Sequence, residues 1–374
     1  MKLTTLQDTA ATALGIVGKA VASRSTLPIL ANVLIEADGE LAAATACNLE
    51  VYLRVEFGAK VAEPGRLTLP HKTLADLVNT MPAEPLTLAT DDKRATATLT
   101  CGRTKSTIKG MAADEFPAMP RLDRLKATAI GAQTLKGMVR AVAFASLTDT
   151  SRPVLASQYW RLGDGSLKLA TSDGFRVAEV SRLMDGPTCA AILPARAAEI
   201  LAQLIDGNDD DVLFELRDGR ALFRVGSVEL VAVLIDGEFP RYEGIVPRST
   251  GTKVTIATSD AVRACKTVDV IARDAASAHF VRMTVKPGSE LAPGSITFCG
   301  EAAETGDGVV EIDAKVEGPE MVFALNAVYA REAFAAVTTP SLSIEAVSPT
   351  SPVMVRPVGE DGQWSITMPL HLGK

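Results

Sequence analysis

A threefold internal repeat is the feature of this sequence that most constrains its fold. A short strand-like segment that runs into an amphipathic helix occurs at residues 65–78, again at 191–204 and again at 322–334. The chain has 374 residues, so a period of about 125 residues fills it with three copies. A repeat of this length is a whole domain, large enough to bury a core of its own.

Each third begins with a segment whose apolar residues follow the helical period. The three apolar stripes start at Leu6, Leu135 and Val262. Thr4 and Gln7 have the spacing of a capping box, which places the start of the first helix beside them. Strand-like segments with alternating or β-branched residues follow the helices, at residues 27–35, 154–160 and 280–285.

Each third then ends in alternating strands and tight turns, such as the hairpin turn at Asp218-Gly219. Polar stretches at 121–128 and 247–253 are the expected linkers. The sequence therefore predicts an α+β chain in which helices cover one face of antiparallel sheet. The predicted domains are residues 1–124, 125–250 and 251–374. Two such chains joined head to tail can close a ring, with helices inside and sheets outside.

Composition excludes several classes of protein. Apolar residues make up 47% of the chain, but no apolar run is long enough to span a membrane, and the first acid, Asp8, comes too early for a signal peptide. We therefore expect a cytoplasmic protein. The net charge of −7 argues against a uniformly basic nucleic-acid binder, although one basic face remains compatible with it. The five scattered cysteines contain no Cys-x-x-Cys and are interpreted as reduced, packed thiols.

Four segments, in order along the whole chain, resemble the bacterial DNA polymerase III beta subunit family, the sliding clamps. They are Ser23-Arg-Ser-Thr-Leu-Pro-Ile-Leu-Ala-Asn32, Thr171-Ser-Asp-Gly-Phe-Arg-Val-Ala178, Gly237-Glu-Phe-Pro-Arg-Tyr with Val246-Pro247, and Met368-Pro-Leu-His-Leu372. The resemblance implies a homodimeric ring around duplex DNA, a processivity factor without catalytic activity or cofactor. Its implied partners are the replicative polymerase subunit, the clamp-loader ATPase, repair polymerases, ligase and mismatch-repair proteins, and the implied location is the cytoplasm, at the nucleoid.

A ring that slides needs diffuse positive charge and no base-specific contacts. The three leading helices together carry a net charge of +3, in a chain whose net charge is −7. Lys136 and Arg140 supply this charge in the second helix. The resemblance adds Arg24, Lys72 and Arg196, which stand near basic, DNA-facing positions of the family.

A second functional surface implied by the resemblance is an apolar groove that binds short peptides. The positions carried over are Arg152, Leu155, Asp173, Gly174, Phe175, Arg176, Val177, Pro240, Ile245, Met368, Pro369, Leu370, His371 and Leu372. Phe175 stands where the family usually has His, His371 where it has Arg, and Gly244 where a basic residue is common. These departures concern the preferred peptide more than the existence of the groove.

The subunit interface is expected to pair an edge strand of the first domain with one of the third. Ile108 occupies the family's apolar interface position, and Val270 and Ile271 are the expected partners in the third domain. Because Ser106 is polar where an aromatic residue is common, a weak dimer is a further hypothesis.

Two other readings remain open. An enzyme is disfavoured, because the three histidines have no metal-ligand spacing and the phosphate-loop and Gly-x-Ser-x-Gly motifs are absent. The acidic run Asp209-Asp-Asp211 is interpreted as a solvated turn rather than a magnesium site. The second alternative, motivated by the altered groove residues, is a diverged clamp-like binding module that is not used in bulk replication.

Overall fold

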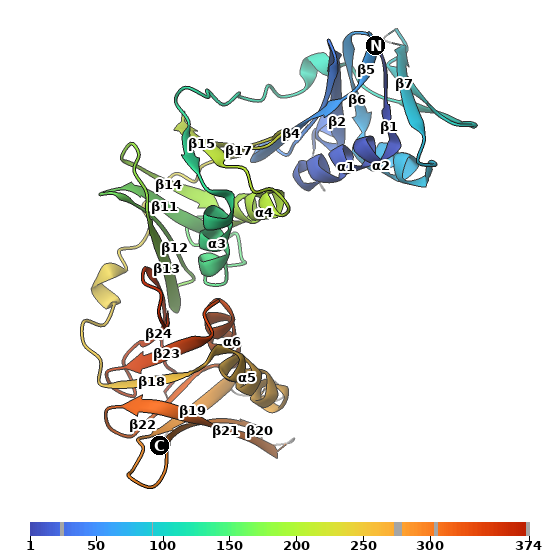
Figure 1. Ribbon diagram of the computed structural model, residues 1–374. Helices are drawn as coiled ribbons and strands as arrows, with labels where there is room; N and C mark the ends of the chain where they lie inside the picture. Colours follow the sequence, from blue (N-terminus) through green and yellow to red (C-terminus); the bar gives the residue numbers. More distant parts are fainter. Residues whose placement is uncertain (23–25, 92, 273–278, 303–305, 372–374) are drawn as a thin grey trace. The chain divides into compact units, whose positions relative to one another are not determined.

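The computed structural model describes residues 1–22, 26–91, 93–272, 279–302 and 306–371. Its elements repeat one order three times (Figure 1): a strand, a helix, four strands, a second helix and three strands, with one additional strand, β5, in the first repeat. This order confirms the three tandem α+β domains predicted from the sequence.

The elements of the first repeat are β1 (Lys2–Leu6), α1 (Gln7–Val17), β2 (Asn32–Asp38), β3 (Leu41–Cys47), β4 (Val51–Gly58), β5 (Lys60–Glu63), β6 (Gly65–Pro70), α2 (His71–Thr80), β7 (Pro85–Asp91), β8 (Thr96–Cys101) and β9 (Thr104–Lys109). Those of the second are β10 (Thr128–Ile130), α3 (Ala132–Ala143), β11 (Ser157–Gly163), β12 (Ser166–Ser172), β13 (Arg176–Leu183), β14 (Cys189–Pro194), α4 (Ala195–Ile205), β15 (Val212–Arg217), β16 (Arg220–Val225) and β17 (Val228–Val233).

The third repeat contains β18 (Thr252–Ala257), α5 (Thr258–Ala272), β19 (Phe280–Lys286), β20 (Gly294–Ala302), β21 (Gly306–Glu317), β22 (Met321–Asn326), α6 (Ala327–Ala335), β23 (Ser341–Ala346), β24 (Val353–Pro357) and β25 (Gln363–Thr367). The strand-to-helix motif that revealed the repeat is therefore β6–α2, β14–α4 and β22–α6.

The predicted capping box at the start of the first helix is wrong. Thr4 lies in β1, and Leu6, which ends that strand, is 56% exposed instead of belonging to the buried stripe of α1. Gln7 does not reach back to the chain before it. Its side-chain Nε2 donates to the carbonyl oxygen of Val78 in α2, at 2.7 Å. The short strand before each leading helix was missed because it is only three to six residues long.

Two of the predicted strands begin later than expected. Residues 28–31 form a 3₁₀ turn, and β2 begins only at Asn32. Pro28 lies at the start of that turn, where its fixed φ suits a helix and its missing N–H costs nothing. Likewise β11 begins at Ser157 rather than at Val154. The hairpin turn at Asp218-Gly219 is confirmed, because both residues have positive φ, 51° and 67°.

The strands of every repeat fall into two sets. In one set the first strand and the last three lie side by side, as in β10-β15-β16-β17. In the other set the middle strands pair among themselves, as in β14-β11-β12-β13. The last strand of one repeat then pairs with the middle set of the repeat before it. This joins β17 to β4, and β25 to β13. Sheets of eight and twelve strands therefore cross the domain boundaries.

The described chain divides into two compact units that do not follow the repeats. One contains residues 1–136 and 196–234, the other residues 137–195 and 235–374. The division passes through the middle repeat, because its two strand sets belong to sheets shared with different neighbours. No helix within the described ranges is long and apolar enough to cross a membrane.

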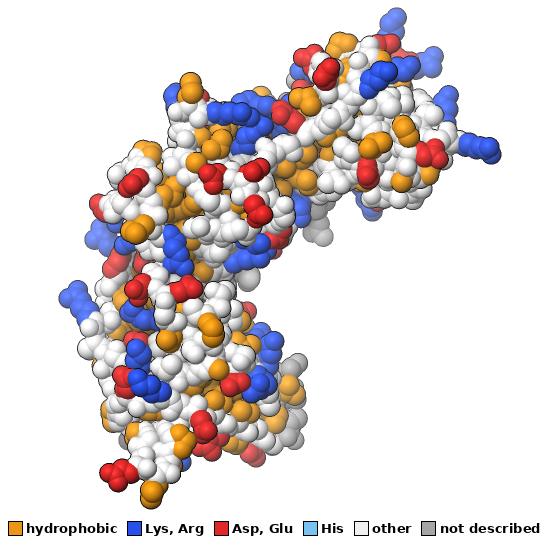
Figure 2. Space-filling view, in the orientation of Figure 1, with side chains coloured by type: hydrophobic (Ala, Val, Ile, Leu, Met, Phe, Trp, Pro, Cys, Tyr) orange, Lys and Arg blue, Asp and Glu red, His pale blue; other side chains and the backbone are white. Residues whose placement is uncertain are grey.

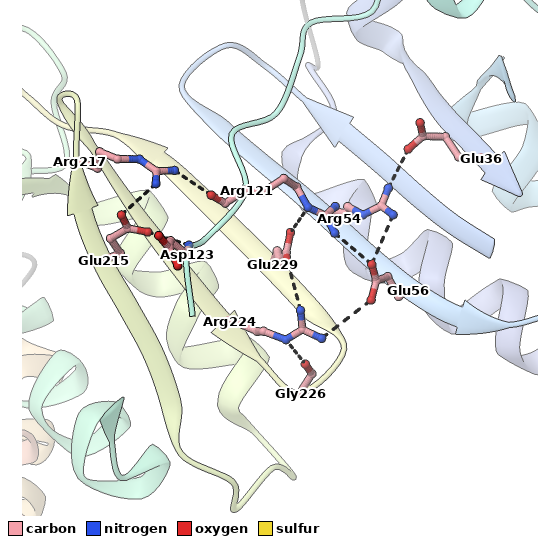
Figure 3. A network of polar contacts seen from close by, with 10 residues as sticks. All are labelled: Glu36, Arg54, Glu56, Arg121, Asp123, Glu215, Arg217, Arg224, Gly226 and Glu229. Atoms are coloured by element: carbon pink, nitrogen blue, oxygen red, sulfur yellow. Dashed lines mark hydrogen bonds and ion pairs between the residues drawn. The ribbon is translucent and has the colours of Figure 1, made fainter. Parts of the chain in front are cut away.

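Ion pairs surround the β4–β17 junction, in which Leu230 lies opposite Leu53 (Figure 3). Arg224 on β16 is 3.2 Å from Glu229 on β17, and Arg121 reaches Glu56 on β4 at 3.1 Å (NH2 to Oε1). Part of the expected linker 121–128 is thereby fixed to the sheet.

Arg54 extends this network by contacting Glu36 of β2 at 2.7 Å. At Glu56, burial acts to raise the pKa. The hydrogen bonds and charges of Arg121 and Arg54 act against burial and hold the pKa below its ordinary value. The carboxylate form of Glu56 is therefore part of the folded junction.

Candidate docking groove and nucleic-acid interface

An apolar row crosses the second junction, between β13 and β25. Val177 on β13 lies opposite Ile366 on β25, and Ile366 lies opposite Met354 on β24. Residues directly opposite one another in a sheet share a face, so the three side chains are neighbours. Tyr242, from the segment that connects the second and third repeats, packs against this row. Val177 is the only one of these four residues that the sequence analysis assigned to the groove.

Aromatic side chains fix that connecting segment. Glu179 on β13 accepts hydrogen bonds from the Tyr242 hydroxyl at 2.6 Å and from Trp364 Nε1 on β25 at 3.2 Å. Phe239 stacks on Tyr159, with ring centroids 5.3 Å apart. Burial, together with the hydrogen bond to the Glu179 carboxylate, raises the pKa of Tyr242 well above its ordinary value. The tyrosine is therefore a neutral donor at physiological pH.

The turn before β13 presents Phe175 to solvent. Asp173 Oδ1 accepts from the backbone N–H groups of Phe175 and Arg176, at 2.9 and 3.1 Å, which is an Asx turn. Gly174 has φ +94°, a conformation that favours glycine. Phe175 is 64% exposed as a result. The segment Asp173–Val177 is thus a rigid corner that displays one aromatic ring.

Arg176 lies on the opposite face of β13 from Val177. Its Nε donates to Asp173 Oδ2 at 2.9 Å and its NH1 donates to Glu332 Oε2 on α6 at 2.6 Å. The guanidinium also stacks 4.0 Å from the centroid of the Tyr329 ring. Arg176 is only 8% exposed, and these contacts join β13 to α6.

The chain end follows the edge of this corner. The backbone N–H of Met368 donates to the Phe175 carbonyl at 2.9 Å, and that of Leu370 donates to the Ala324 carbonyl at 2.8 Å. Backbone bonding therefore holds the segment, while the Met368 and Leu370 side chains remain 42% and 39% exposed. Pro369 is half-buried and His371 is exposed; the predicted groove residue Leu372 lies outside the described residues.

The remaining predicted groove positions surround the row less closely. Arg152, Pro240 and Ile245 are exposed, and Leu155 is half-buried. The Leu155 N–H donates to the Arg152 carbonyl at 3.0 Å, in the turn before β11. The structure thus brings Val177, Phe175 and Met368 together.

The predicted DNA-facing residues differ in exposure and in their known ion pairs. Lys72 on α2 is exposed, and Arg196 on α4 is 66% exposed with only a long contact to Glu199, at 3.7 Å. Lys136 on α3 is bound to Asp206 at 2.6 Å, which reduces its availability to phosphate. Arg140, also on α3, is exposed. Arg24 lies outside the described residues.

Comparison with known proteins decides the family. The DNA polymerase III beta subunit N-terminal domain matches residues 1–120, the central domain matches 129–241 and the C-terminal domain matches 243–371. The chain belongs to the DNA polymerase III beta subunit family. It is 29% identical, over the full length of both chains, to the Beta sliding clamp of Synechococcus elongatus, and 24% identical to that of Staphylococcus aureus over 99% of each.

Solved structures of beta subunits have the same fold. The sliding clamp of Bacillus subtilis matches all of both chains with a TM-score of 0.94 at 22% identity. A Pseudomonas aeruginosa clamp solved bound to griselimycin matches with a TM-score of 0.91, also at 22% identity and full coverage. The family membership confirms the DNA sliding clamp predicted from the sequence, which is a replication protein without catalytic activity of its own.

One basic surface of this beta-subunit chain was missed by counting charges. Arg263 and Lys266 on α5 line a shallow groove of about 480 Å³, together with Val262 and residues at the end of α6, and Arg263 is paired with Asp260 at 2.7 Å. The leading helix has no net charge in the sequence, but Asp269 is buried and binds Arg331 at 3.0 Å. Its charge is therefore not presented beside Lys266. Figure 2 shows basic and acidic side chains interspersed over the face in view.

The interface residues predicted for the beta-subunit dimer do not all lie on strands. Ile108 is on β9, but it is 6% exposed and faces the core of its own repeat. Val270 and Ile271 are on helix α5, and Val270 is 56% exposed. A Cβ atom placed on Gly308 of β21 would lie 3.0 Å from Ile271 Cδ1. Ile271 therefore adjoins β21.

Proposed function

We propose that two copies of this chain join head to tail into a closed ring around duplex DNA, through β9 of one copy and β21 of the other. The pairing rule of the two internal junctions carries this proposal. In both, the last strand of one repeat pairs with the fourth strand of the repeat before it: β17 pairs with β4, and β25 pairs with β13. Applied once more, the rule assigns β9 a partner equivalent to β13, which is β21.

Both strands have an edge for this pairing. Among the described residues, β9 pairs only with β8, and β21 has a neighbour other than β20 only from Lys315 onward. Residues 306–314 of β21 therefore leave backbone groups unpaired on one side. Strand addition at such an edge satisfies them, and a heterologous contact of suitable rotation closes a ring.

Charge supports the pairing. Lys105 and Lys109 are exposed on β9, whereas Asp307, Glu311 and Asp313 are exposed on β21. Opposite charges attract across a β9–β21 contact, whereas like charges would repel each other in a β9–β9 or β21–β21 contact. This complementarity opposes the weak dimer suggested by Ser106.

A charge exchange tests the interface. Lys105→Glu with Lys109→Glu is expected to dissociate the dimer at micromolar concentration in analytical ultracentrifugation, and so is Glu311→Lys with Asp313→Lys. A chain that carries all four changes restores opposite charges at both contacts and is expected to dimerise again. This pairing would be excluded if the variant with all four changes stays monomeric, or if the variants changed only on β9 or only on β21 stay dimeric.

For DNA we propose sequence-independent contacts by Lys72, Arg140 and Arg196, with Lys136 and Arg24 as further predicted positions. Lys266 and Arg263 on α5 extend the set to the third repeat. Such contacts release counterions, so direct binding to a short linear duplex, from whose ends a closed ring can slide, is expected to fall steeply with added salt. Lys72→Glu with Arg196→Glu is expected to reduce this salt dependence, and binding to the linear duplex that ignores salt would argue against phosphate contacts.

We infer that the apolar row and the corner at Phe175 form a groove for short peptides of the replicative polymerase subunit. The clamp-loader ATPase, repair polymerases, ligase and mismatch-repair proteins are proposed to use the same groove, in the cytoplasm at the nucleoid. Exposed Phe175, Met368 and Leu370 support this, because they offer apolar side chains on a backbone that is already hydrogen-bonded.

Primer extension on circular single-stranded DNA, with loader and polymerase from the same source, tests the function as a whole. The chain is expected to lengthen the products of a single binding event. Normal DNA loading without longer products would instead favour the diverged binding module, whose motive is the altered groove residues Phe175, Gly244 and His371.

A further inference from the structure

A small cavity adjoins the end of the apolar row. It has a volume of about 100 Å³ and lies between the segment 247–250 and strands β23 and β24. Met354, the last member of the row, forms part of its wall, and so do Arg248 and Arg356. The row therefore leads from Val177 into a cavity whose lining contains two guanidinium groups.

These two arginines have unused hydrogen-bonding capacity. Arg356 is 44% exposed, its Nε lies 2.8 Å from the Met354 sulfur, and its nearest carboxylate oxygen, on Glu345, is 3.9 Å away. Arg248 is exposed and makes no hydrogen bond or ion pair within the described ranges of the chain. An arginine has five N–H donors, so most of those at the cavity are free for a ligand.

The one acid of the cavity is already compensated. Glu345 is 13% exposed and accepts from the Ser343 hydroxyl at 3.0 Å and from the Thr250 hydroxyl at 3.2 Å. Lys253 lies 3.8 Å from the same carboxylate. With Arg248, Arg356 and Glu345, the lining has two cations and one anion, and Lys253 beside it adds further positive charge. A second carboxylate entering from outside would be attracted, and a cation would be repelled.

We propose that this cavity is a cationic subsite of the groove, which binds the side chain of an Asp or Glu that flanks the apolar anchors of a docked peptide. The proposal rests on the peptide groove proposed above. An arginine can bind a carboxylate through two parallel N–H···O bonds. Met354 and the aromatic rings of Phe239 and Tyr242 cannot do so. The subsite thus favours peptides in which an acid follows the apolar residues.

The test uses a library of acetylated and amidated decapeptides that carry one fixed leucine and random residues elsewhere. The library is selected on the full chain, on Arg248→Gln with Arg356→Gln, and on the control Arg161→Gln, which removes an exposed arginine of β11. We expect Asp and Glu to be enriched on the wild type and on the control. On the double variant that enrichment is expected to disappear, while apolar enrichment remains.

One selected peptide and its Asp→Asn counterpart are then compared by calorimetry. The acid is expected to improve the Kd about fivefold on the wild type, as suits a partly exposed ion pair, and not at all on the double variant. The fivefold difference is expected to shrink as NaCl is raised.

Three results would overturn the proposal, and they separate it from the groove itself. Apolar enrichment without a preference for acids removes the subsite but leaves the groove. If the same peptides bind only when they are made with a free carboxyl terminus, the cavity belongs to a chain end instead of a side chain. Failure of every peptide to bind removes the groove and the subsite together.

Discussion

The two junctions between repeats use the same backbone pairing but different side chains. Each joins its strands through five aligned residue pairs. The β4–β17 junction is surrounded by arginines and carboxylates, with Glu229 at its centre. The β13–β25 junction is covered by an apolar row and by aromatic rings that donate to one carboxylate, Glu179.

The two kinds of side chain suit the junctions to different tasks, one to fixing the register of the strands and the other to binding a partner. An ion-pair network fixes direction and register, but its charges are already satisfied and it offers little apolar area to a partner. The apolar row gives less orientation, and the exposed side chains beside it, Phe175, Met368 and Leu370, leave a surface from which a partner can displace water. The junction that carries the proposed groove is the one whose chemistry permits docking.

The largest expected effect distinguishes the two central carboxylates. Glu229→Gln removes one of the two carboxylates that Arg224 and Arg121 contact in a partly buried site, leaving Glu56, and is expected to cost about 2 kcal/mol. Glu179→Gln leaves two neutral donors and keeps one acceptor, so we expect about 1 kcal/mol. Thermal unfolding of the two variants measures the difference; equal losses would show that the junctions do not differ in kind.

Acidification is expected to loosen the first junction before the second. The pKa of Glu56 lies below its ordinary 4.5 in the folded chain, so the unfolded chain binds a proton first as pH falls. Its stabilisation is present above pH 4.5 and is lost as pH falls through the folded value. Amide hydrogen exchange of β17 should accelerate in this range, whereas that of β25 should change less. In Glu56→Gln the acid-dependent acceleration should be absent.

Alkaline pH is expected to act on the second junction through Tyr242. The pKa of Tyr242 is raised, so above its ordinary value of 10.0 the unfolded chain loses this proton while the folded chain keeps it. The stability that Tyr242 contributes is therefore complete below pH 10 and declines above it. Tyr242→Phe should cost about 1 kcal/mol at neutral pH and should remove part of this decline. An identical alkaline profile in the variant would contradict the assignment.

The smallest effect on stability is expected at Phe175. Because its ring is 64% exposed, Phe175→Ala should change the unfolding free energy by no more than about 0.5 kcal/mol. Peptide affinity should nevertheless fall if the ring belongs to the groove. Val177→Ala, at a buried position of the same strand, should reduce both quantities, and serves as the matched comparison.

The sequence was sufficient for the repeated architecture because apolar periodicity recurs wherever a helix or strand buries one face. It also located Val177 and Met368, whose neighbours in the chain carry recognisable patterns. It could not locate Tyr242, Trp364 or Glu179 as one cluster. Their contact depends on the alignment of β13 with β25, and that register is set by residues far apart in the chain.

Charge counting failed for a related reason. Lys136 and Asp269 each contributed one charge to a helix in the sequence, yet Lys136 is bound to Asp206 and Asp269 is buried against Arg331. Arg176 was assigned to the groove together with Val177 by the family resemblance, although alternate residues of a strand point to opposite faces. In each case the partner, and not the residue itself, decides what remains available to a ligand.

The strand pairing between successive repeats also bears on how such a chain could grow or shrink. Each repeat offers one edge to the repeat before it and one to the repeat after it, by the same rule at both internal junctions. Nothing in that rule depends on a peptide bond between the two partners. Gene duplication or fission could therefore change the number of repeats per polypeptide while preserving the contacts between neighbours. In this fold, the order in which repeats contact one another therefore does not depend on which repeats share a polypeptide.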